Sequence, residues 1–312
     1  MRIVFIGTGE IGVPSLRALL NAPQHQLVGV ITQPDKPVGR EQRLTAPPIK
    51  TALAGSPVPI FQPARIRHED AVAQLRALAP DLIVVMAYGQ ILPKSVLEIP
   101  RIACLNLHAS LLPRHRGAAP IQAAIAAGDA EAGITVIYMN EGLDTGDMLL
   151  QKTLSISPNE TGGSLHGSLA ELAPEALHSA LKLLATGKAP RNPQPAAGVT
   201  YAPKLTRDDG KIDWSQPAAA IERKIRAFDP WPGAFTQLSD GSGKMRHLKI
   251  FRASLDAREV GPPGTLSQPN DTEVLVATGQ GALRLEAVQL EGKRRMSAVD
   301  FFRGFSSPRL HF

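Results

Sequence analysis

The sequence contains a single cysteine, Cys104, so an internal disulfide is impossible. Proteins without disulfide frameworks are typical of reducing compartments, which favours the cytoplasm. Long apolar runs are also missing: no stretch of about 18 consecutive apolar residues occurs, which argues against a membrane-spanning helix. The first residues, MRIVFIGTGEIG, break a short apolar run with glycines, which is typical of a buried strand and turn and not of a signal peptide.

Aromatic residues are few, at 4%, and charged residues make up only 20% of the chain. Because the apolar fraction is 43%, this composition excludes a disordered protein, and a length of 312 residues predicts two domains. The net charge is +6, and residues 204–312 hold +4 of it, with 17 Lys and Arg against 13 Asp and Glu. This basic surplus indicates a polyanionic partner, with a solvated surface as the alternative.

Short apolar runs alternate with helical patterns in the first part of the chain. Strands are predicted at residues 2–7, 27–31, 58–61, 82–86, 102–107 and 133–139. Helices are predicted around residues 11–20 and at 70–78, 120–127 and 164–185. The alternation predicts an α/β fold, in which a Rossmann-like, mostly parallel sheet is covered by helices on both faces.

Proline is concentrated in residues 188–198, KAPRNPQPAAG, which is typical of a semi-rigid linker. We therefore predict a first domain over residues 1–187, a linker over 188–203 and a second domain over 204–312. In the second domain one helix is expected at 218–227, and the rest consists of short strands with Gly and Pro turns. That pattern predicts a small, OB-like β-barrel.

Residues 7–12, GTGEIG, match the G-x-G-x-x-G pattern of dinucleotide-binding turns. Such a site also requires an acidic residue at the end of the second strand, where it binds the ribose hydroxyls. That strand ends in Thr32 and Gln33, and Asp35 comes only after Pro34. We therefore interpret the glycines as a tight strand-to-helix turn, with a dinucleotide-dependent oxidoreductase as the alternative.

The strand predicted at 102–107 runs into polar residues. Asn106 and His108 are two positions apart, so on a strand they point to the same face. Cys104 has the same parity but lies deeper, and we interpret it as a small core residue. Open α/β sheets bind ligands at the C-terminal ends of their strands. Since buried polar groups need partners, the pair is either a hydrogen-bonded core feature or part of an active site.

Residues 140–147, NEGLDTGD, follow the strand predicted at 133–139 and contain three acids, Glu141, Asp144 and Asp147. Any of the three could reach a neighbouring strand end, and an ordinary acidic loop is the alternative. The combination of Asn, His and an acid suits acyl transfer to an amine, because the amine itself is the nucleophile. Asn106 and a protonated His108 could stabilise the oxyanion, while the acid orients His108 and helps to move a proton.

These residues, together with residues 110–121 (SLLPRHRGAAPI) and 142–147 (GLDTGD), resemble the 10-formyltetrahydrofolate-dependent formyltransferases. The resemblance implies that Asn106, His108 and Asp144 are catalytic and that 10-formyltetrahydrofolate is the co-substrate. No His or Cys cluster has metal-ligand spacing, so no metal is expected. The resemblance also implies the residues that bind the folate: Ser110, Leu111, Leu112 and Pro113, with Gln90, Ile91, Leu92 and the loop 140–144 around the pterin.

Members of this family act on methionyl-tRNA, glycinamide ribonucleotide or sugar nucleotides, or hydrolyse formyltetrahydrofolate. Residues 32–40, 87–93, 212–214 and 225–233 resemble the members that act on methionyl-tRNA. We therefore expect a monomer that formylates the methionine on initiator methionyl-tRNA for translation initiation. A sugar-nucleotide formyltransferase is the first alternative, and a non-catalytic RNA-binding protein is the second.

A basic loop is expected to contact the acceptor end of the tRNA through Lys36, Arg40 and Arg43. The basic second domain is expected to hold phosphates of the tRNA stem. In the family this loop usually continues Gly-Arg-Gly, whereas here Glu41 follows Arg40. Glu41 therefore adds a negative charge and a less flexible backbone to the RNA-binding loop.

Overall fold

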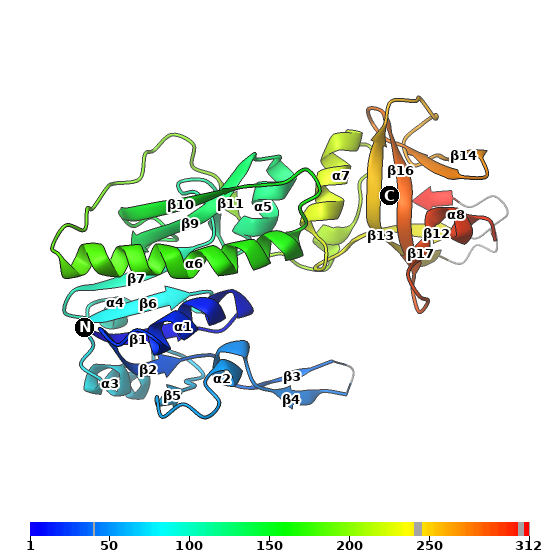
Figure 1. Cartoon of the computed structure of the whole chain (residues 1–312). Helices are drawn as coiled ribbons and strands as arrows, with labels where there is room; N and C mark the ends of the chain where they lie inside the picture. The colour runs from blue at the N-terminus through cyan, green and yellow to red at the C-terminus, as the bar shows by residue number, and fades with distance from the viewer. Residues whose placement is uncertain (40, 240–244, 305–308, 312) are drawn as a thin grey trace. The chain divides into compact units, whose positions relative to one another are not determined.

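The structure is a computed structural model that describes residues 1–39, 41–239, 245–304 and 309–311. It divides into two compact units (Figure 1). The first consists of Met1–Pro120, Glu131–Ser155 and His166–Ala202, and the second of Ile121–Ala130, Ile156–Leu165 and Pro203–Phe312. Two short segments from the first half of the chain thus belong to the second unit, together with the region predicted as the second domain.

A seven-stranded sheet lies at the centre of the first unit, in the order β10-β9-β7-β6-β1-β2-β5 among the described residues. Strands β5, β2, β1, β6 and β7 are parallel to one another, as the alternating pattern predicted. Their bounds are β1 Arg2–Gly7, β2 Gln26–Ile31, β5 Ile60–Phe61, β6 Leu82–Met86 and β7 Ala103–His108. The mostly parallel, Rossmann-like sheet predicted from the sequence is therefore present.

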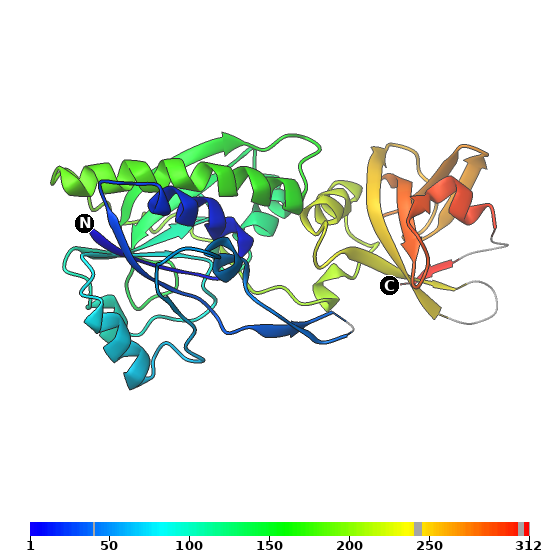
Figure 2. The ribbon, with the colours of Figure 1, turned by 60° about the horizontal axis from the view of Figure 1, so that its bottom comes forward.

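Helices cover both faces of this sheet. Figure 2 shows α1 and α6 on one side and α3 on the other. Four consecutive residues of β1, from Ile3 to Ile6, have no exposed surface, which explains why this strand is apolar without alternation. The bounds of the helices are η1 Glu10–Gly12, α1 Val13–Leu20, α2 Pro48–Ala52, α3 Glu69–Ala77, α4 Lys94–Leu97, α5 Pro120–Ala127 and α6 Gly162–Ala185.

Two strands depart from the parallel arrangement. Strand β9 (Glu131–Tyr138) is antiparallel to β7, and β10 (Met148–Ser155) is antiparallel to β9. The sequence did not reveal β10, because this edge strand is half exposed and its residues lack a long apolar run. The antiparallel course of β9 matters for the site, since its C-terminal end lies beside Cys104 and not beside the C-terminal end of β7.

The glycine turn after β1 is used for packing. The amides of Thr8 and Gly9 donate to the carbonyl of Ala87 at 3.2 and 3.4 Å, so they are not free to bind a pyrophosphate. A side chain at Gly7 would lie 2.8 Å from the carbonyl oxygen of Met86. These contacts support the interpretation of residues 7–12 as a tight turn packed against the end of β6.

Asp35, the acid that comes after the second strand, is also occupied. Its carboxylate accepts from Gln62 at 2.7 Å and from Lys50 at 2.8 and 2.9 Å. The hydrogen bond from Gln62, followed by the one from Lys50, holds the pKa of Asp35 below its ordinary value. The Asp35 carboxylate therefore stabilises the loop in which it lies, through Gln62 and Lys50, instead of facing a ribose. This further weakens the alternative of a dinucleotide-dependent oxidoreductase.

Two short strand pairs complete the first unit. Strands β3 (Lys36–Val38) and β4 (Arg43–Thr45) form an antiparallel hairpin whose described residues are all exposed. Strands β8 (Arg116–Gly117) and β11 (Tyr201–Ala202) are parallel to each other. The second pair joins the segment after β7 to the last residues of this unit.

The second unit is built on an antiparallel sheet of seven described strands, with α7 (Ala218–Ala227) packed against β13. One core cluster fills it, including Trp214, which is fully buried and donates through Nε1 to Thr236 at 3.0 Å. Register shifts in β13 bend that strand, so the sheet curves around the core as expected for a small barrel. The remaining bounds are η2 Asp208–Gly210, β12 Ala234–Ser239, β13 Met245–Asp256, β14 Leu266–Asn270, β15 Glu273–Ala277, β16 Ala282–Leu290, β17 Met296–Ser297, α8 Ala298–Phe302 and β18 Arg309–His311.

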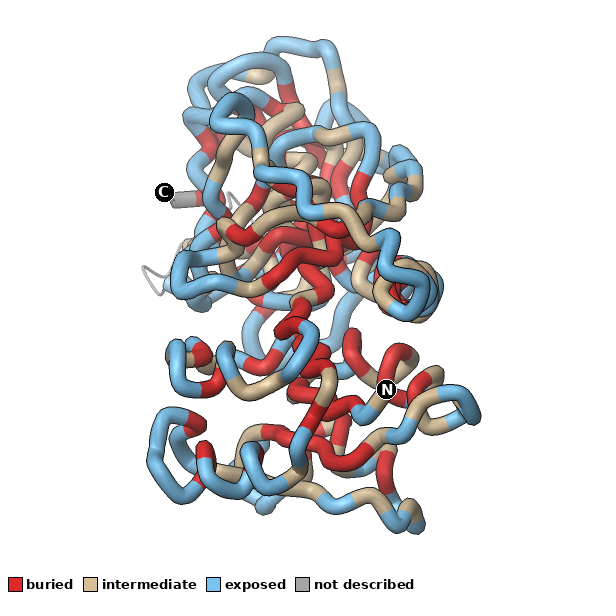
Figure 3. Tube along the Cα trace, turned by 90° about the vertical axis from the view of Figure 1, so that its left-hand side faces the viewer, coloured by how far each residue is buried: buried red, intermediate tan, exposed pale blue. Residues whose placement is uncertain are grey.

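Figure 3 shows buried residues gathered inside each unit, whereas the exposed residues lie mostly at its periphery. Among the helices that the structure describes, none combines the length and the apolar character needed to cross a membrane.

Candidate active site

Asn106 and His108 lie at the C-terminal end of β7 and continue the row of side chains that begins at Cys104. Cys104 belongs to the core cluster on the face covered by α3 and α4, and so do Val4 of β1 and Ile83 of β6. Because alternate residues of a strand share a face, Asn106 and His108 point to that same side. His108 is only 5% exposed, so its ring is held inside the protein and not in solvent.

Cys104 is a core residue, as the sequence indicated. It is 5% exposed, its Sγ lies 3.6 Å from Sδ of Met139, and burial raises the pKa of the thiol to about 12. Because only the thiolate is reactive, we expect no labelling of the native protein by a thiol-specific dye at neutral pH. Unfolding in guanidinium chloride should expose one reactive thiol. Rapid labelling of the native protein would contradict this placement.

Asp144 reaches the pair although β9 does not end beside it. From the sequence, any of the three acids in residues 140–147 could reach a neighbouring strand end, and antiparallel β9 ends beside Cys104. Oδ1 of Asp144 accepts from Nδ2 of Asn106 at 3.2 Å, and Oδ2 lies 3.6 Å from Nδ1 of His108. The structure thus brings together the three predicted catalytic residues, whose chemical role stays a prediction.

The two nitrogens of the His108 ring have different partners. Nε2 lies 2.9 Å from the carbonyl oxygen of His115. A carbonyl can only accept, so Nε2 carries a proton, and Nδ1 is the nitrogen that faces Asp144. A second proton on Nδ1 would point at the carboxylate. Asp144 can therefore orient the ring and balance its positive charge, as we expected from the sequence.

The segment after β7 is rigidly held. Thr135 of β9 donates to the carbonyl of Ser110 at 2.6 Å and accepts from the amide of Leu112 at 3.1 Å, and Gln151 of β10 donates to the carbonyl of Leu112 at 2.9 Å. The side chain of Ser110 donates to the carbonyl of Arg114 at 2.7 Å. Thr135 and Gln151 were not identified from the sequence, because nothing near them marks a site.

The predicted folate residues differ in exposure. Ser110 and Leu112 are buried, while Leu111 and Pro113 are partly exposed and could contact a ligand with their side chains. Ser110 and Leu112 would contribute to folate binding only by shaping the turn after β7. Which atoms touch the folate stays a prediction.

The predicted pterin segment follows β6, the parallel neighbour of β7, so both meet at the C-terminal edge of the sheet. The side chain of Gln90 is bound to the loop before α3: it accepts from the amide of Ile66 at 2.9 Å and donates to the carbonyl of Ala64 at 3.2 Å. Ile91 is 85% exposed and Leu92 is buried. Gln90 thus fixes the loop, and its backbone and Ile91 remain available to a ligand.

The predicted RNA loop is the β3–β4 hairpin. Lys36 begins β3 and Arg43 begins β4, and both are exposed. Arg40 lies outside the described residues. Nε of Arg43 lies 2.7 Å from Oε2 of Glu41, the residue that departs from the family pattern. Glu41 therefore partly neutralises the charge of Arg43.

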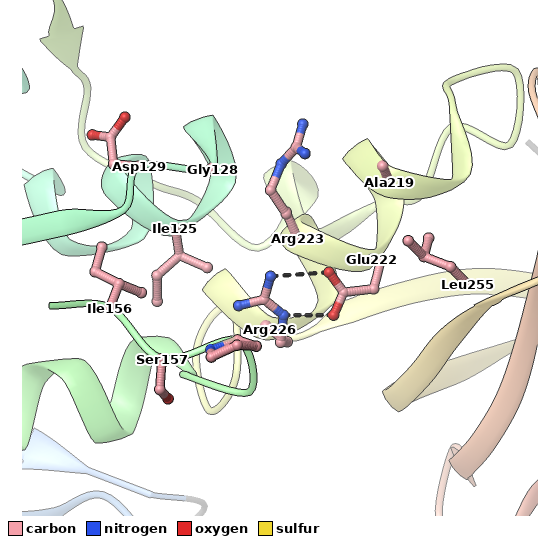
Figure 4. A pocket seen from close by; sticks show the side chains of 11 residues that line it. Ile125, Gly128, Asp129, Ile156, Ser157, Ala219, Glu222, Arg223, Arg226 and Leu255 are labelled. Carbon is pink, nitrogen blue, oxygen red and sulfur yellow. Dashed lines mark hydrogen bonds and ion pairs between the residues drawn. The ribbon is translucent and has the colours of Figure 1, made fainter.

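A pocket in the second unit contains none of these residues. Figure 4 shows it beside α7, where Glu222 and Arg226 form a bidentate pair. Arg226 also donates to the carbonyl of Glu160 at 2.9 Å, and Arg223 donates to that of Ala126 at 3.1 Å. These arginines hold the second unit together, and the pocket has no acid–base group arranged like the one at β7. The described part of the chain contains no group of three or more His, Cys, Asp or Glu side chains that could bind a metal ion.

With this geometry in place, comparison with known proteins defines the class. Residues 1–181 match the family described as formyl transferase, and residues 204–306 match the formyl transferase C-terminal domain. The chain belongs to the formyl transferase family. The resemblance inferred from residues 106–147 is therefore confirmed, and the chain is an enzyme.

The curated relatives are more specific. A protein of Akkermansia muciniphila named methionyl-tRNA formyltransferase is 46% identical over 100% of this chain and 99% of its own length. Seven others of the same name are 43–49% identical over 97–98% of this chain.

Solved structures share the fold. WlaRD, described as a sugar 3N-formyl transferase in the presence of dTDP and 5-N-formyl-THF, has a TM-score of 0.66 at 17% identity, covering 94% of this chain and 99% of its own. HypX from Aquifex aeolicus in complex with tetrahydrofolic acid has a TM-score of 0.62 at 19% identity. This chain is fully covered but spans only 51% of HypX.

Proposed function

We propose that this protein transfers the formyl group of 10-formyltetrahydrofolate to the amino group of methionine on initiator methionyl-tRNA. One observation carries the proposal. In a chain of the formyl transferase family, Asn106, His108 and Asp144 converge at the C-terminal end of β7, with Asp144 contacting the other two. An amide, an imidazole and a carboxylate in this arrangement suit acyl transfer between two nitrogens.

The reaction exchanges one carbon–nitrogen bond for another. The methionine amine attacks the formyl carbon, and negative charge develops on the formyl oxygen. Asn106 donates to that oxygen the amide proton not used by Asp144. A protonated His108, whose two N–H groups face Asp144 and the carbonyl of His115, stabilises the negative charge through its own positive charge. The bond from the formyl carbon to N10 of the folate then breaks, the amine loses one proton and N10 gains one. Asp144 helps this proton transfer directly or through water, and the products are N-formylmethionyl-tRNA and tetrahydrofolate.

Two features favour tRNA over a sugar nucleotide as the acceptor. The eight curated relatives named methionyl-tRNA formyltransferase cover nearly the whole chain at 43–49% identity, whereas the sugar formyltransferase WlaRD shares only 17%. Residues 204–312 also hold +4 of the net charge, which suits a polyanion. Lys36, Arg40 and Arg43 of the β3–β4 hairpin are the proposed contacts to the acceptor end.

The deciding experiment is an assay of formyl transfer from 10-formyltetrahydrofolate to charged initiator tRNA. Charged elongator methionyl-tRNA and a UDP-amino sugar are tested in parallel. The proposal predicts rapid formylation of the initiator only. Formylation of the sugar without any activity on charged tRNA would replace it with the alternative, and steeply salt-dependent tRNA binding without turnover would indicate a non-catalytic RNA-binding protein.

Replacing Glu41 with Gly should strengthen tRNA binding. The substitution removes a negative charge from the hairpin and frees Arg43, whose ion pair with Glu41 is fully at the surface. Because exposed pairs contribute only about 0–1 kcal/mol, we expect Kd for initiator tRNA to fall by about two- to fivefold at low salt. Filter binding across a salt series measures this, and an unchanged or higher Kd at low salt would contradict it.

We further infer that the enzyme acts as a monomer in the cytoplasm. A charged tRNA substrate and a single buried thiol, Cys104, are compatible with that compartment. Analytical ultracentrifugation at working concentrations tests the oligomeric state, and a stable dimer would contradict it.

A further inference from the structure

We propose that Gln194 is a positioning residue for formyl transfer, which acts by holding the turn that carries Asp144. The inference rests on the proposed function. Gln194 lies in residues 188–198, the stretch predicted as a linker from its prolines. Within residues 191–198 every residue is exposed except Gln194, which is half-buried. A single inward-turned polar side chain in an exposed segment indicates a specific contact.

All the hydrogen-bonding capacity of this side chain is used. Its Nε2 donates to the carbonyl oxygens of Asp144 at 2.7 Å and of Gly146 at 2.9 Å. Its Oε1 accepts from Nη2 and Nε of Arg116 at 2.7 and 3.1 Å. An arginine can only donate and a backbone carbonyl can only accept, so the amide fits in one orientation alone. Glutamine is thus selected by its surroundings.

The turn that Gln194 holds needs such support. Asp144 has φ of 51°, in the left-handed region that residues other than glycine seldom occupy. A strained backbone of this kind persists only where neighbouring groups hold it. The same residue places its carboxylate between the amide of Gly117, at 2.9 Å, and Nδ2 of Asn106. Release of the Asp144 carbonyl would let the backbone relax and move the carboxylate away from Asn106 and His108.

The residues just before Gln194 contact β9 and β10, the two strands that flank the loop 140–147. The guanidinium of Arg191 lies 3.8 Å from the ring centroid of Tyr138, the last residue of β9. Asn192 exchanges two backbone hydrogen bonds with Met148, the first residue of β10, at 2.8 and 3.0 Å. These contacts fix the position of Gln194 next to the turn. Gln194 and Asp144 both belong to the first unit, so folding of that unit brings them together.

Replacing Gln194 with Met tests the inference, because methionine keeps the length of the side chain and removes every hydrogen bond. We expect kcat for charged initiator tRNA to fall by about 10- to 100-fold, since small misplacements of a catalytic group are that costly. KM for charged initiator tRNA should change by less than about threefold, because no group proposed to bind the tRNA is altered. The melting temperature should stay close to that of the unmodified protein, which separates positioning from loss of folding.

The matched control is Gln26→Met. Gln26 is the first residue of β2, at the opposite end of the sheet, and its side chain accepts one hydrogen bond, from Arg2 at 3.2 Å. The same chemical change there should leave kcat unaltered.

A second variant, Gln194→Glu, separates the donor role from mere space filling. The introduced carboxylate still accepts from Arg116 but cannot donate to the two carbonyls. We expect a loss of kcat similar to that of Gln194→Met at about pH 8, and partial recovery relative to the unmodified protein towards about pH 5, where a protonated carboxyl group donates one bond. If Gln194 only filled space, Gln194→Glu would show neither the loss of kcat nor the pH dependence of that loss.

The outcomes are distinct. Full activity of both variants beside an active unmodified protein would overturn the role of Gln194 alone. A loss through KM with kcat unchanged would also overturn it, because that result assigns Gln194 to substrate binding. Failure of the unmodified protein to formylate charged initiator tRNA would overturn the proposed function and this inference with it.

Discussion

Replacing Asp144 with Asn should lower kcat for formyl transfer by about 10²–10⁴-fold, while Kd for tRNA stays close to its original value. The Asp144 carboxylate accepts from Asn106 and from the amide of Gly117, and it faces Nδ1 of His108. An asparagine has one acceptor oxygen, so its NH2 group would point at one of these donors. It also cannot balance the charge of His108. Single-turnover formylation and filter binding with the same tRNA measure the two quantities.

The control for this prediction is Asp70→Asn, the same substitution in the first turn of α3, outside the residues predicted to bind either substrate. Asp70 is exposed, so its neutralisation should leave most of the rate intact. If Asp144→Asn retained most of its rate, or if the two variants lost activity equally, the assignment of Asp144 would be wrong.

Replacing Gly146 with Ala should cost both stability and activity. A Cβ at this position would lie 1.6 Å from the carbonyl oxygen of Tyr138, so the loop must move away from the end of β9. That movement disturbs the carbonyl of Gly146, which accepts from Gln194, and the neighbouring Asp144. We expect about 1–3 kcal/mol of destabilisation and about 100-fold lower kcat. Chemical denaturation and the formylation assay report the two effects.

Gly167→Ala supplies the contrasting result. Gly167 is an exposed residue inside α6, and a Cβ there meets nothing within 4 Å. Since alanine is favoured over glycine in a helix by about 0.5–1 kcal/mol, this variant should be slightly more stable and equally active. If Gly146→Ala behaved like Gly167→Ala, the close packing of the catalytic loop would be refuted.

Much of the fold could be predicted because local patterns were strong. The continuous apolar runs of β1 and β6 and the amphipathic pattern of α6 were identified close to their observed bounds. Edge strand β10 was missed, since a half-exposed strand at the border of a sheet has a weak pattern. The short hairpin β3–β4 was interpreted as a loop for the same reason.

The first half of the site could be predicted from one strand. The spacing of Asn106 and His108 determines that they share a face, wherever the strand lies in the sheet. The choice among Glu141, Asp144 and Asp147 could not be made from spacing, because the path of the loop depends on the direction of β9. The resemblance to a known family supplied Asp144, and the antiparallel pairing of β9 with β7 supplies the physical route by which it arrives.

The sequence by itself determined the buried strands and main helices of the first unit, the shared face of Asn106 and His108 and the basic surplus of the second domain, because each follows from composition or from a short repeat. Only the tertiary structure decided which groups surround those residues. Gln194 is about 50 residues from Asp144 in the chain, in a proline-rich stretch without any signal of its own. Its contact arises because the chain after α6 returns across β9 and β10, and hydrogen bonds between such distant segments have no local signature.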